Sequence, residues 1–397
     1  RSKAQARLNR LRPGSSTALA AVKCADGSMA TTPESIAAEL RQYWRDVFAT
    51  KPSDSDMLAT WVRDEFGAQP PFGSDTNWDI TSEHVVRAIK LVPKTAPGPD
   101  GIPYLAWKRL GDFGADILFH AVGRLGEHDA HSALCGMARA SIEDGHDFNL
   151  GNMVFLPKKP AGTDPVLGDF YTAADVRPLV IVNTDNRLMA NAVRIAMEPI
   201  LAGWISSNQH GFIKDRSMLA NVVDVTHMAQ LVSLGHDQGG VMLFDFRAAF
   251  PSLSHAYLHA ALRALGLPTH LLNFIQNLYD CHKCNIVVAG SGLHEGFGIQ
   301  AGIRQGCPLS PLLFALVIDL LLRRMQRLHP EITIRAFADD IAVVAPDILA
   351  CLPCLTQVFA EAARVAGLHL NIPKCVLIPL WQVDGGLLNR DIARLFP

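Results

Sequence analysis

The sequence lacks an excess of charge of either sign. Its 397 residues include 36 Lys and Arg against 38 Asp and Glu, which gives a formal net charge of -2. Proteins that bind nucleic acid over a broad surface are usually clearly basic. The balance argues against such a surface, and a polyanionic partner would need a local basic channel within a mixed surface.

Long hydrophobic runs are also missing. The longest, residues 312–322, is interrupted by Asp319 and is shorter than the ~20 residues that span a bilayer. The first twelve residues carry five basic side chains, which could contact phosphates, but no apolar segment of the kind found in a signal peptide. With 49% hydrophobic and 19% charged residues, the chain is predicted to be a folded, intracellular protein without a membrane partner.

The eight cysteines include two C-x-x-C pairs, Cys281 with Cys284 and Cys351 with Cys354. Two such pairs can form a zinc site. Neither pair is surrounded by a His or Cys knuckle with its turn residues, the first pair opens an apolar strand-like segment, and Pro353 lies within the second pair. We therefore expect reduced thiols rather than a bound zinc ion.

The order of predicted elements indicates an α+β fold. A helical apolar stripe covers residues 33–48, residues 50–79 look loose, and Thr81 is placed to cap a helix over 83–91. From residue 151 short apolar strands alternate with helices, which predicts a mostly antiparallel sheet with helices on one face. Strands are expected at 153–156, 179–182, 241–246, 285–289, 332–336, 341–344 and 368–372, and helices at 187–201, 254–266, 310–328 and 354–366.

Two of the apolar strands end in acids. Asp245 closes the first, and the pair Asp339-Asp340 lies between the two strands of a predicted hairpin. Carboxylates beside dry strands are costly unless they are paired or bind cations, and oxygen ligands suit Mg²⁺. The alternative is a pair of solvent-facing turn acids, and the acids by themselves do not exclude it.

The rest of the sequence supplies a context for these acids. Seven segments stand in a fixed order: TAPGPDGIP at 95–103, VFLPKK at 154–159 followed by VRPL at 176–179, NQHGF at 208–212 with Arg216, FDFRAAF at 244–250, GIRQGCPLSPLLF at 302–314, FADD at 337–340, and GLHLN at 367–371 with Lys374.

This series resembles the reverse transcriptases of non-LTR (LINE-type) retrotransposons, over roughly residues 80–380. The resemblance implies a right-hand polymerase fold: an extension at 1–78, fingers at 79–240, and a palm at 241–397 whose 281–306 segment lies at the junction with the fingers. It shows no thumb. It further implies an RNA-directed DNA polymerase that uses an RNA template, a DNA primer or target and dNTPs. If the host is eukaryotic, the expected location is the nucleus.

Carried over to this sequence, the family pattern assigns Mg²⁺ binding to Asp245, Asp339 and Asp340, with Mn²⁺ as an alternative ion. Phe250 would lie under the sugar and disfavour a ribose 2′-hydroxyl, although core packing is the simpler role for a phenylalanine. The remaining residues assigned to substrate are Lys158 and Arg177 on the triphosphate, Gln305 and Gly306 near the nascent base pair, and Phe246. Lys374 would either protonate the leaving pyrophosphate or hold the end of a strand.

One position departs from the family pattern, which usually has Asp where this chain has Pro251. We interpret the change as an altered turn, because that acid is not among the three metal ligands. Two alternatives stay open: a catalytically inert palm that binds RNA only, and a reverse transcriptase of the group II intron maturase type. An RNA-dependent RNA polymerase is disfavoured by Phe250.

Overall fold

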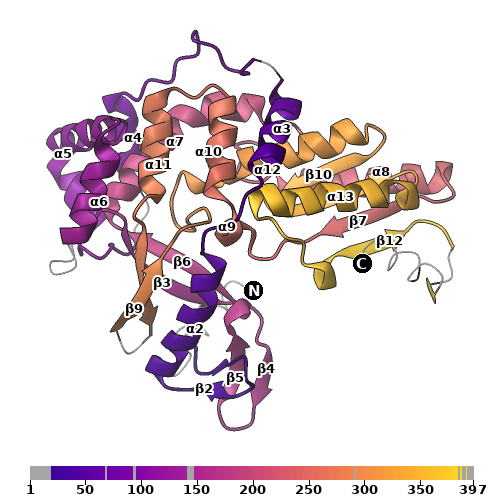
Figure 1. Cartoon of the computed structure of the whole chain (residues 1–397), viewed down its shortest axis with the longest axis horizontal. Helices are drawn as coiled ribbons and strands as arrows, with labels where there is room; N and C mark the ends of the chain where they lie inside the picture. The colour runs from indigo at the N-terminus through magenta and orange to yellow at the C-terminus, as the bar shows by residue number, and fades with distance from the viewer. Residues whose placement is uncertain are drawn as a thin grey trace, which may run out of the picture.

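The computed structural model describes residues 19–67, 69–92, 95–140, 147–289, 292–382, 385–386 and 390. The five basic residues near the N-terminus lie outside the described residues. Figure 1 shows the elements. The helices are α2 (Pro33–Val47), α3 (Ser55–Phe66), α4 (Ser82–Leu91), α5 (Tyr104–Leu125), α6 (Ala130–Ala140), α7 (Thr184–Trp204), α8 (Met218–Gly235), α9 (Ala249–Ser252), α10 (His255–Ala264), α11 (Thr269–Tyr279), α12 (Ser310–Leu328) and α13 (Ile348–Ala366). The strands are β1 (Val22–Lys23), β2 (Met29–Ala30), β3 (Leu150–Pro157), β4 (Gly162–Asp164), β5 (Gly168–Thr172), β6 (Val176–Val182), β7 (Gly240–Phe244), β8 (Lys283–Val288), β9 (Gly292–Gly298), β10 (Thr333–Phe337), β11 (Asp340–Ala345) and β12 (Val376–Pro379).

The strands that carry the acids lie in one antiparallel sheet, in the order β10-β11-β7-β12. Met242 and Phe244 of β7 point into the main core with α12 and α13, whereas Val241 packs with Val232 of α8 in a separate small cluster. Alternate residues of a strand face opposite sides, so α8 lies on the other face of this sheet. The antiparallel sheet backed by helices is confirmed, but the helices cover both of its faces rather than one.

A second sheet has the order β6-β3-β8-β9, in which β3 and β8 are parallel. The segment 281–306 thus contributes two strands to the sheet that carries the VFLPKK motif. Helix α2 covers this sheet, and Trp44, Phe155 and Phe297 share one apolar cluster. A small third sheet, β2-β1-β5-β4, extends beyond α2, as Figure 1 shows at the bottom of the view. The N-terminal segment is therefore packed onto the strands that follow it.

Several helix ends lie close to their predicted positions: Thr81 precedes α4, Ser254 caps α10, and Gly367 ends α13 with a φ of 73°. Thr32, which was not predicted as a cap, caps α2 with Pro33 in its first turn. A left-handed residue at a helix C-terminus is most easily a glycine.

Other predictions were wrong. Residues 50–79 include helix α3, whose cap Asp54 accepts from the Met57 N–H. The strand expected at 368–372 is a single bridge from Leu370 to Phe246, followed by a 3-10 turn at Ile372–Lys374. Helix α13 begins at Ile348 because Asp347 caps it, so the second C-x-x-C pair lies inside the helix.

The expectation of reduced thiols fails at Cys281, which forms a disulfide with Cys135 across 146 residues of sequence. A pairing between distant cysteines leaves no local signal in the sequence. Among the described residues, α13 is the one helix with the length and hydropathy of a membrane span. Its apolar face, including Leu355, Phe359 and Ala362, packs in the main core.

Candidate active site

A cavity of about 630 Å³ lies where the two larger sheets meet. It brings together segments from the whole length of the described chain. Nine of the ten predicted site residues line it: Lys158, Arg177, Asp245, Phe246, Phe250, Gln305, Asp339, Asp340 and Lys374. Gly306 is outside the lining. The predicted residues therefore share one cavity, although they come from five separate segments of the sequence.

The acids reach the cavity through the β10–β11 hairpin. Phe337 pairs with Asp340, which leaves Ala338 and Asp339 as a two-residue turn. In the neighbouring pair of strands Ile341 faces Phe244, so the next step of the register puts Asp340 beside Asp245. Three carboxylates thus gather at one end of the antiparallel sheet, and the alternative of unrelated solvent-facing turn acids does not fit this register.

The turn depends on a residue in an unfavourable backbone conformation. Ala338 has a φ of 60°, in the left-handed region that costs a residue with a Cβ roughly 1–2 kcal/mol. Gln209 compensates for this cost. Its fully buried side chain accepts from the Ala338 N–H at 2.9 Å and donates to the Ala338 carbonyl at 3.1 Å.

Gly211 of the NQHGF segment packs directly against the acidic turn. A Cβ at Gly211 would lie 2.0 Å from the Ala338 nitrogen, closer than any side chain could be accommodated. Gly211 also donates its N–H to Gln209 Oε1 at 2.7 Å. The NQHGF segment is therefore the support of the acidic turn. The motif is evident in the sequence, but no local pattern there assigned a role to Gln209.

The negative charges of Asp245, Asp339 and Asp340 repel one another. Burial raises the pKa of Asp339, and the negative charges of Asp340 and Asp245 raise it further, with Arg177 acting in the opposite direction. Burial and the charge of Asp245 likewise raise the pKa of Asp340. A divalent cation bound by oxygen ligands would relieve this repulsion. The donor set, three carboxylates at the same end of the sheet and in the same cavity, has the chemistry that suits such an ion.

Asn371 fixes the position of Asp245 and was missed as a site residue. Its amide donates to Asp245 Oδ2 at 2.8 Å, and its backbone N–H donates to the Asp245 carbonyl at 2.7 Å. This asparagine belongs to the GLHLN motif, but it lies 126 residues from Asp245 in the sequence. No local pattern therefore indicated that the two residues meet.

Positive charge faces the acids from the other sheet. Lys158 follows β3, and Arg177 lies on β6, whose register pairs it with Leu156. The pKa of Lys158 is lowered, first by burial and then by the charges of Arg177 and Lys374, while Asp175 and Asp245 oppose the shift. Lys158 and Arg177 therefore lie close together across the cavity from the carboxylates. Lys374 reaches the same cavity from the 3-10 turn before β12, in the sheet that carries the acids.

The two phenylalanines differ in what they offer to the cavity. Phe250 is half-buried, stacks on Phe314 at a centroid distance of 3.9 Å, and meets Phe212 edge to face at 5.9 Å. Its ring is thus held at the wall of the cavity. The ring of Phe246 is buried against Phe359, so the cavity meets mainly its backbone.

The GIRQGCP run joins the two sheets. The Gln305 carbonyl accepts from the Val180 N–H of β6 at 2.9 Å. Gly306 has a φ of 113°, and a Cβ there would lie 2.8 Å from the Val180 carbonyl oxygen. The close approach that requires glycine here is an approach to β6, which orients the Gln305 side of the loop toward the cavity.

Two further residues come from the segment interpreted as an extension. Tyr43 and Trp44 of α2 line the cavity. Burial and the charge of Asp175 raise the pKa of Tyr43, with Arg247 opposing them.

Pro251, where the family pattern has an acid, lies in the short helix α9 and also lines the cavity. The change at Pro251 leaves the three carboxylates in place.

Comparisons with known proteins agree with this geometry. The family described as reverse transcriptase (RNA-dependent DNA polymerase) matches residues 156–383. The Pol polyprotein of the type-2 retrotransposable element R2DM of Drosophila melanogaster is 27% identical over 85% of this chain and 29% of its own length. A 149 kDa protein of the transposon TX1 of Xenopus laevis is 26% identical over 82% of this chain and 24% of its own. The chain thus spans less than a third of these relatives.

Among solved structures, telomerase from Candida albicans in complex with a fragment of telomeric RNA aligns with a TM-score of 0.43. It has 11% identity and covers 58% of this chain and 43% of the telomerase chain. Apo telomerase from Candida tropicalis aligns with a TM-score of 0.44 at 10% identity, over 60% of this chain and 51% of its own. These similarities are weak beside the family match.

Proposed function

The chain belongs to the reverse transcriptase (RNA-dependent DNA polymerase) family, and we propose that it is the catalytic part of an RNA-directed DNA polymerase that adds dNTPs to a primer 3′-hydroxyl. The observation that carries the proposal is the single cavity in which Asp245, Asp339 and Asp340 face Lys158 and Arg177. Acids for a cation on one side and bases for phosphates on the other are what phosphoryl transfer needs.

Members of this family use divalent metal ions, and we propose Mg²⁺ here, with Mn²⁺ as an alternative. Asp245, Asp339 and Asp340 would hold it, since their oxygen ligands and crowded negative charge suit a hard cation. When bound, such ions make the primer hydroxyl a better nucleophile and neutralise charge on the phosphoryl group. Asn371 keeps the Asp245 carboxylate in the orientation that this binding requires.

The bases and the aromatic ring would handle the nucleotide. Lys158 and Arg177 bind the triphosphate oxygens and balance the charge that builds up on them. Phe250, fixed by its stack on Phe314, presents a rigid ring at the position proposed for the sugar. We propose an RNA template and a DNA primer or target as the macromolecular partners.

Primer extension on an RNA template tests this assignment. Asp339→Asn keeps the size of the side chain but removes one charge and one strong ligand. We expect DNA synthesis in the complete natural protein to fall by roughly two orders of magnitude or more, with RNA binding unchanged. The control is Asp116→Asn, which removes an exposed charge on α5, away from the cavity.

The outcome also separates the main alternative. If the unaltered protein binds RNA but extends no primer with Mg²⁺ or Mn²⁺, the chain is an RNA-binding palm without activity. Pro251→Asp would then be the first substitution to test for recovery, because it restores the residue usual in the family. Equal activity of Asp339→Asn and the unaltered protein would contradict the catalytic role of the acids.

A further inference from the structure

A second group of ligand-type side chains lies at the other end of the β10–β11 hairpin. His329 follows α12, Glu331 precedes β10, and Cys351 is in the first turn of α13. Strand β10 has five residues, so about 17 Å of strand separates this group from the acidic turn at Asp339. The group therefore belongs to a different site from the carboxylates of the cavity.

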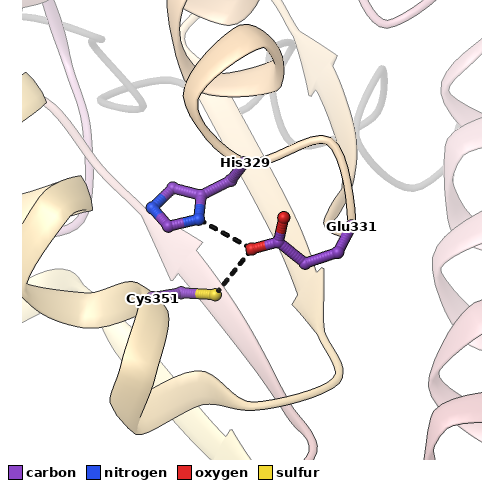
Figure 2. Close-up of side chains that lie close together, drawn as sticks. All are labelled: His329, Glu331 and Cys351. Atoms are coloured by element: carbon purple, nitrogen blue, oxygen red, sulfur yellow. Dashed lines mark hydrogen bonds and ion pairs between the residues drawn. The ribbon is translucent and has the colours of Figure 1, made fainter.

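The three side chains converge on one point, as Figure 2 shows. His329 Nδ1 is 2.7 Å from Glu331 Oε1, and Cys351 Sγ is 3.4 Å from the same oxygen. All three atoms lie within 4.8 Å of one another. Ligands of a tetrahedral zinc ion, each ~2.0–2.3 Å from the metal, lie roughly 3.3–3.8 Å apart. The separation of Cys351 and Glu331 fits this range, and the hydrogen bond of His329 to Glu331 would open by about 1 Å or less.

The site is open to solvent on one side. Cys351 is buried, whereas Glu331 is exposed enough to give an ion a path from solvent. His329 Nδ1 and Cys351 Sγ both converge on the Glu331 carboxylate. An ion that enters from solvent therefore meets the carboxylate first.

The imidazole of His329 is the least well satisfied of the three side chains. The Nε2 atom of His329 is buried and has no hydrogen-bond partner among the described residues. The hydrogen bond of Nδ1 to Glu331 therefore holds the imidazole in place. The site thus offers one sulfur, one nitrogen and one oxygen atom as ligands.

We propose that His329, Glu331 and Cys351 form a binding site for a zinc-class divalent cation, with Cys354 as the nearest additional thiol on the same helix. Mixed sulfur and nitrogen ligands select zinc over magnesium. A bound ion would tie the α12–β10 loop to the start of α13 and so fix the base of the hairpin that carries the acids. The sequence suggested no metal at Cys351 and Cys354, because the two other ligands come from a loop about twenty residues earlier.

Cobalt(II) is a spectroscopic probe for this site, because a cobalt–thiolate bond gives a charge-transfer band. We expect the reduced chain to bind one cobalt ion with that band, and zinc to displace it. Cys351→Ser and His329→Gln should each weaken binding by roughly tenfold or more. Zinc should raise the melting temperature of the unaltered chain by a few degrees, and that of Cys351→Ser much less.

Cys375→Ser is the matched control. Cys375 is a half-buried thiol whose sulfur lies 3.9 Å from the Asp245 carbonyl oxygen, so it is the thiol next to the acidic cavity. The band should persist in Cys375→Ser and in Asp339→Asn, and excess Mg²⁺ should not remove it. If Cys351→Ser does not fold, Glu331→Gln, at an exposed position, replaces it. A band that is absent in the unaltered chain, or unchanged in the His329 and Glu331 variants, would overturn the proposal.

Discussion

Asn371 holds Asp245 by two hydrogen bonds, one from its side-chain amide to the carboxylate at 2.8 Å and one from its backbone N–H to the carbonyl at 2.7 Å. The first orients the carboxylate, and the second fixes the end of β7. Asn371 thus supports Asp245, as Gln209 supports the turn that carries Asp339. Neither of these two supporting residues is a predicted metal ligand.

Asn371→Ala should therefore lower polymerisation while preserving the backbone contact. Loss of a residue that orients a metal ligand typically costs ~10–100-fold in affinity or activity. We expect kcat to fall and the Mg²⁺ concentration for half-maximal activity to rise, with KM for dNTP little changed. Asn273→Ala, which removes a side-chain amide hydrogen bond to the Gly126 carbonyl, far from the cavity, is the control. An unaltered Mg²⁺ requirement would leave Asn371 with a structural role only.

Gln209→Leu should destabilise the acidic turn. The substitution leaves the buried N–H groups of Gly211 and Ala338 without their acceptor, and each such loss costs about 1–3 kcal/mol. We expect the free energy of unfolding to drop by about 2 kcal/mol or more, measured by chemical denaturation. Gln357→Leu, on an exposed helix position, should change it little. Similar stabilities for the two variants would contradict the supporting role of Gln209.

Phe250→Ala should raise incorporation of rNTPs relative to dNTPs. Removing the ring opens space where a 2′-hydroxyl would otherwise clash, and we expect a change of roughly tenfold or more in the ratio of kcat/KM values. Phe314→Leu is informative beside it, since it removes the buried stacking partner without opening the cavity wall directly. The same sugar ratio in Phe250→Ala and the unaltered protein would reduce Phe250 to a core residue.

Acid should destabilise the protein partly through His282. Its ring is fully buried, neither nitrogen has a partner among the described residues, and burial with the charges of Arg304 and His255 puts its pKa well below the usual value. A base with a depressed pKa in the folded state stabilises the fold above its unfolded pKa of ~6.5. That stability is lost as pH falls toward the folded pKa, by up to about 1.4 kcal/mol per pH unit.

His282→Phe removes this loss, so its unfolding free energy should fall less between pH 7 and about 4.5 than that of the unaltered protein. Denaturant titrations at several pH values measure the difference, and His128→Phe, at an exposed position, should follow the unaltered curve. Parallel curves for His282→Phe and the unaltered protein would mean that another group controls acid unfolding.

The sequence alone determined the elements whose signals are local and the segments that carry the chemistry. Caps such as Thr81, Ser254 and Gly367 mark helix ends because their hydrogen bonds or backbone angles concern only neighbouring residues. The acids at Asp245, Asp339 and Asp340 stood out beside apolar strands. Only the resemblance of the surrounding segments to a known family assigned them to a metal. Helix α3 escaped prediction, since its packing against α10 and α13 outweighs a loop-like composition.

Only the tertiary structure decided which distant residues meet. The contacts of Gln209 with Ala338, Asn371 with Asp245, and Cys135 with Cys281 each join segments more than 120 residues apart. The gathering of His329 and Glu331 around Cys351 likewise depends on how the hairpin is placed against α13. Local sequence patterns reflect backbone preferences over a few residues, whereas such pairings are selected by the burial and hydrogen bonding of the whole chain at once.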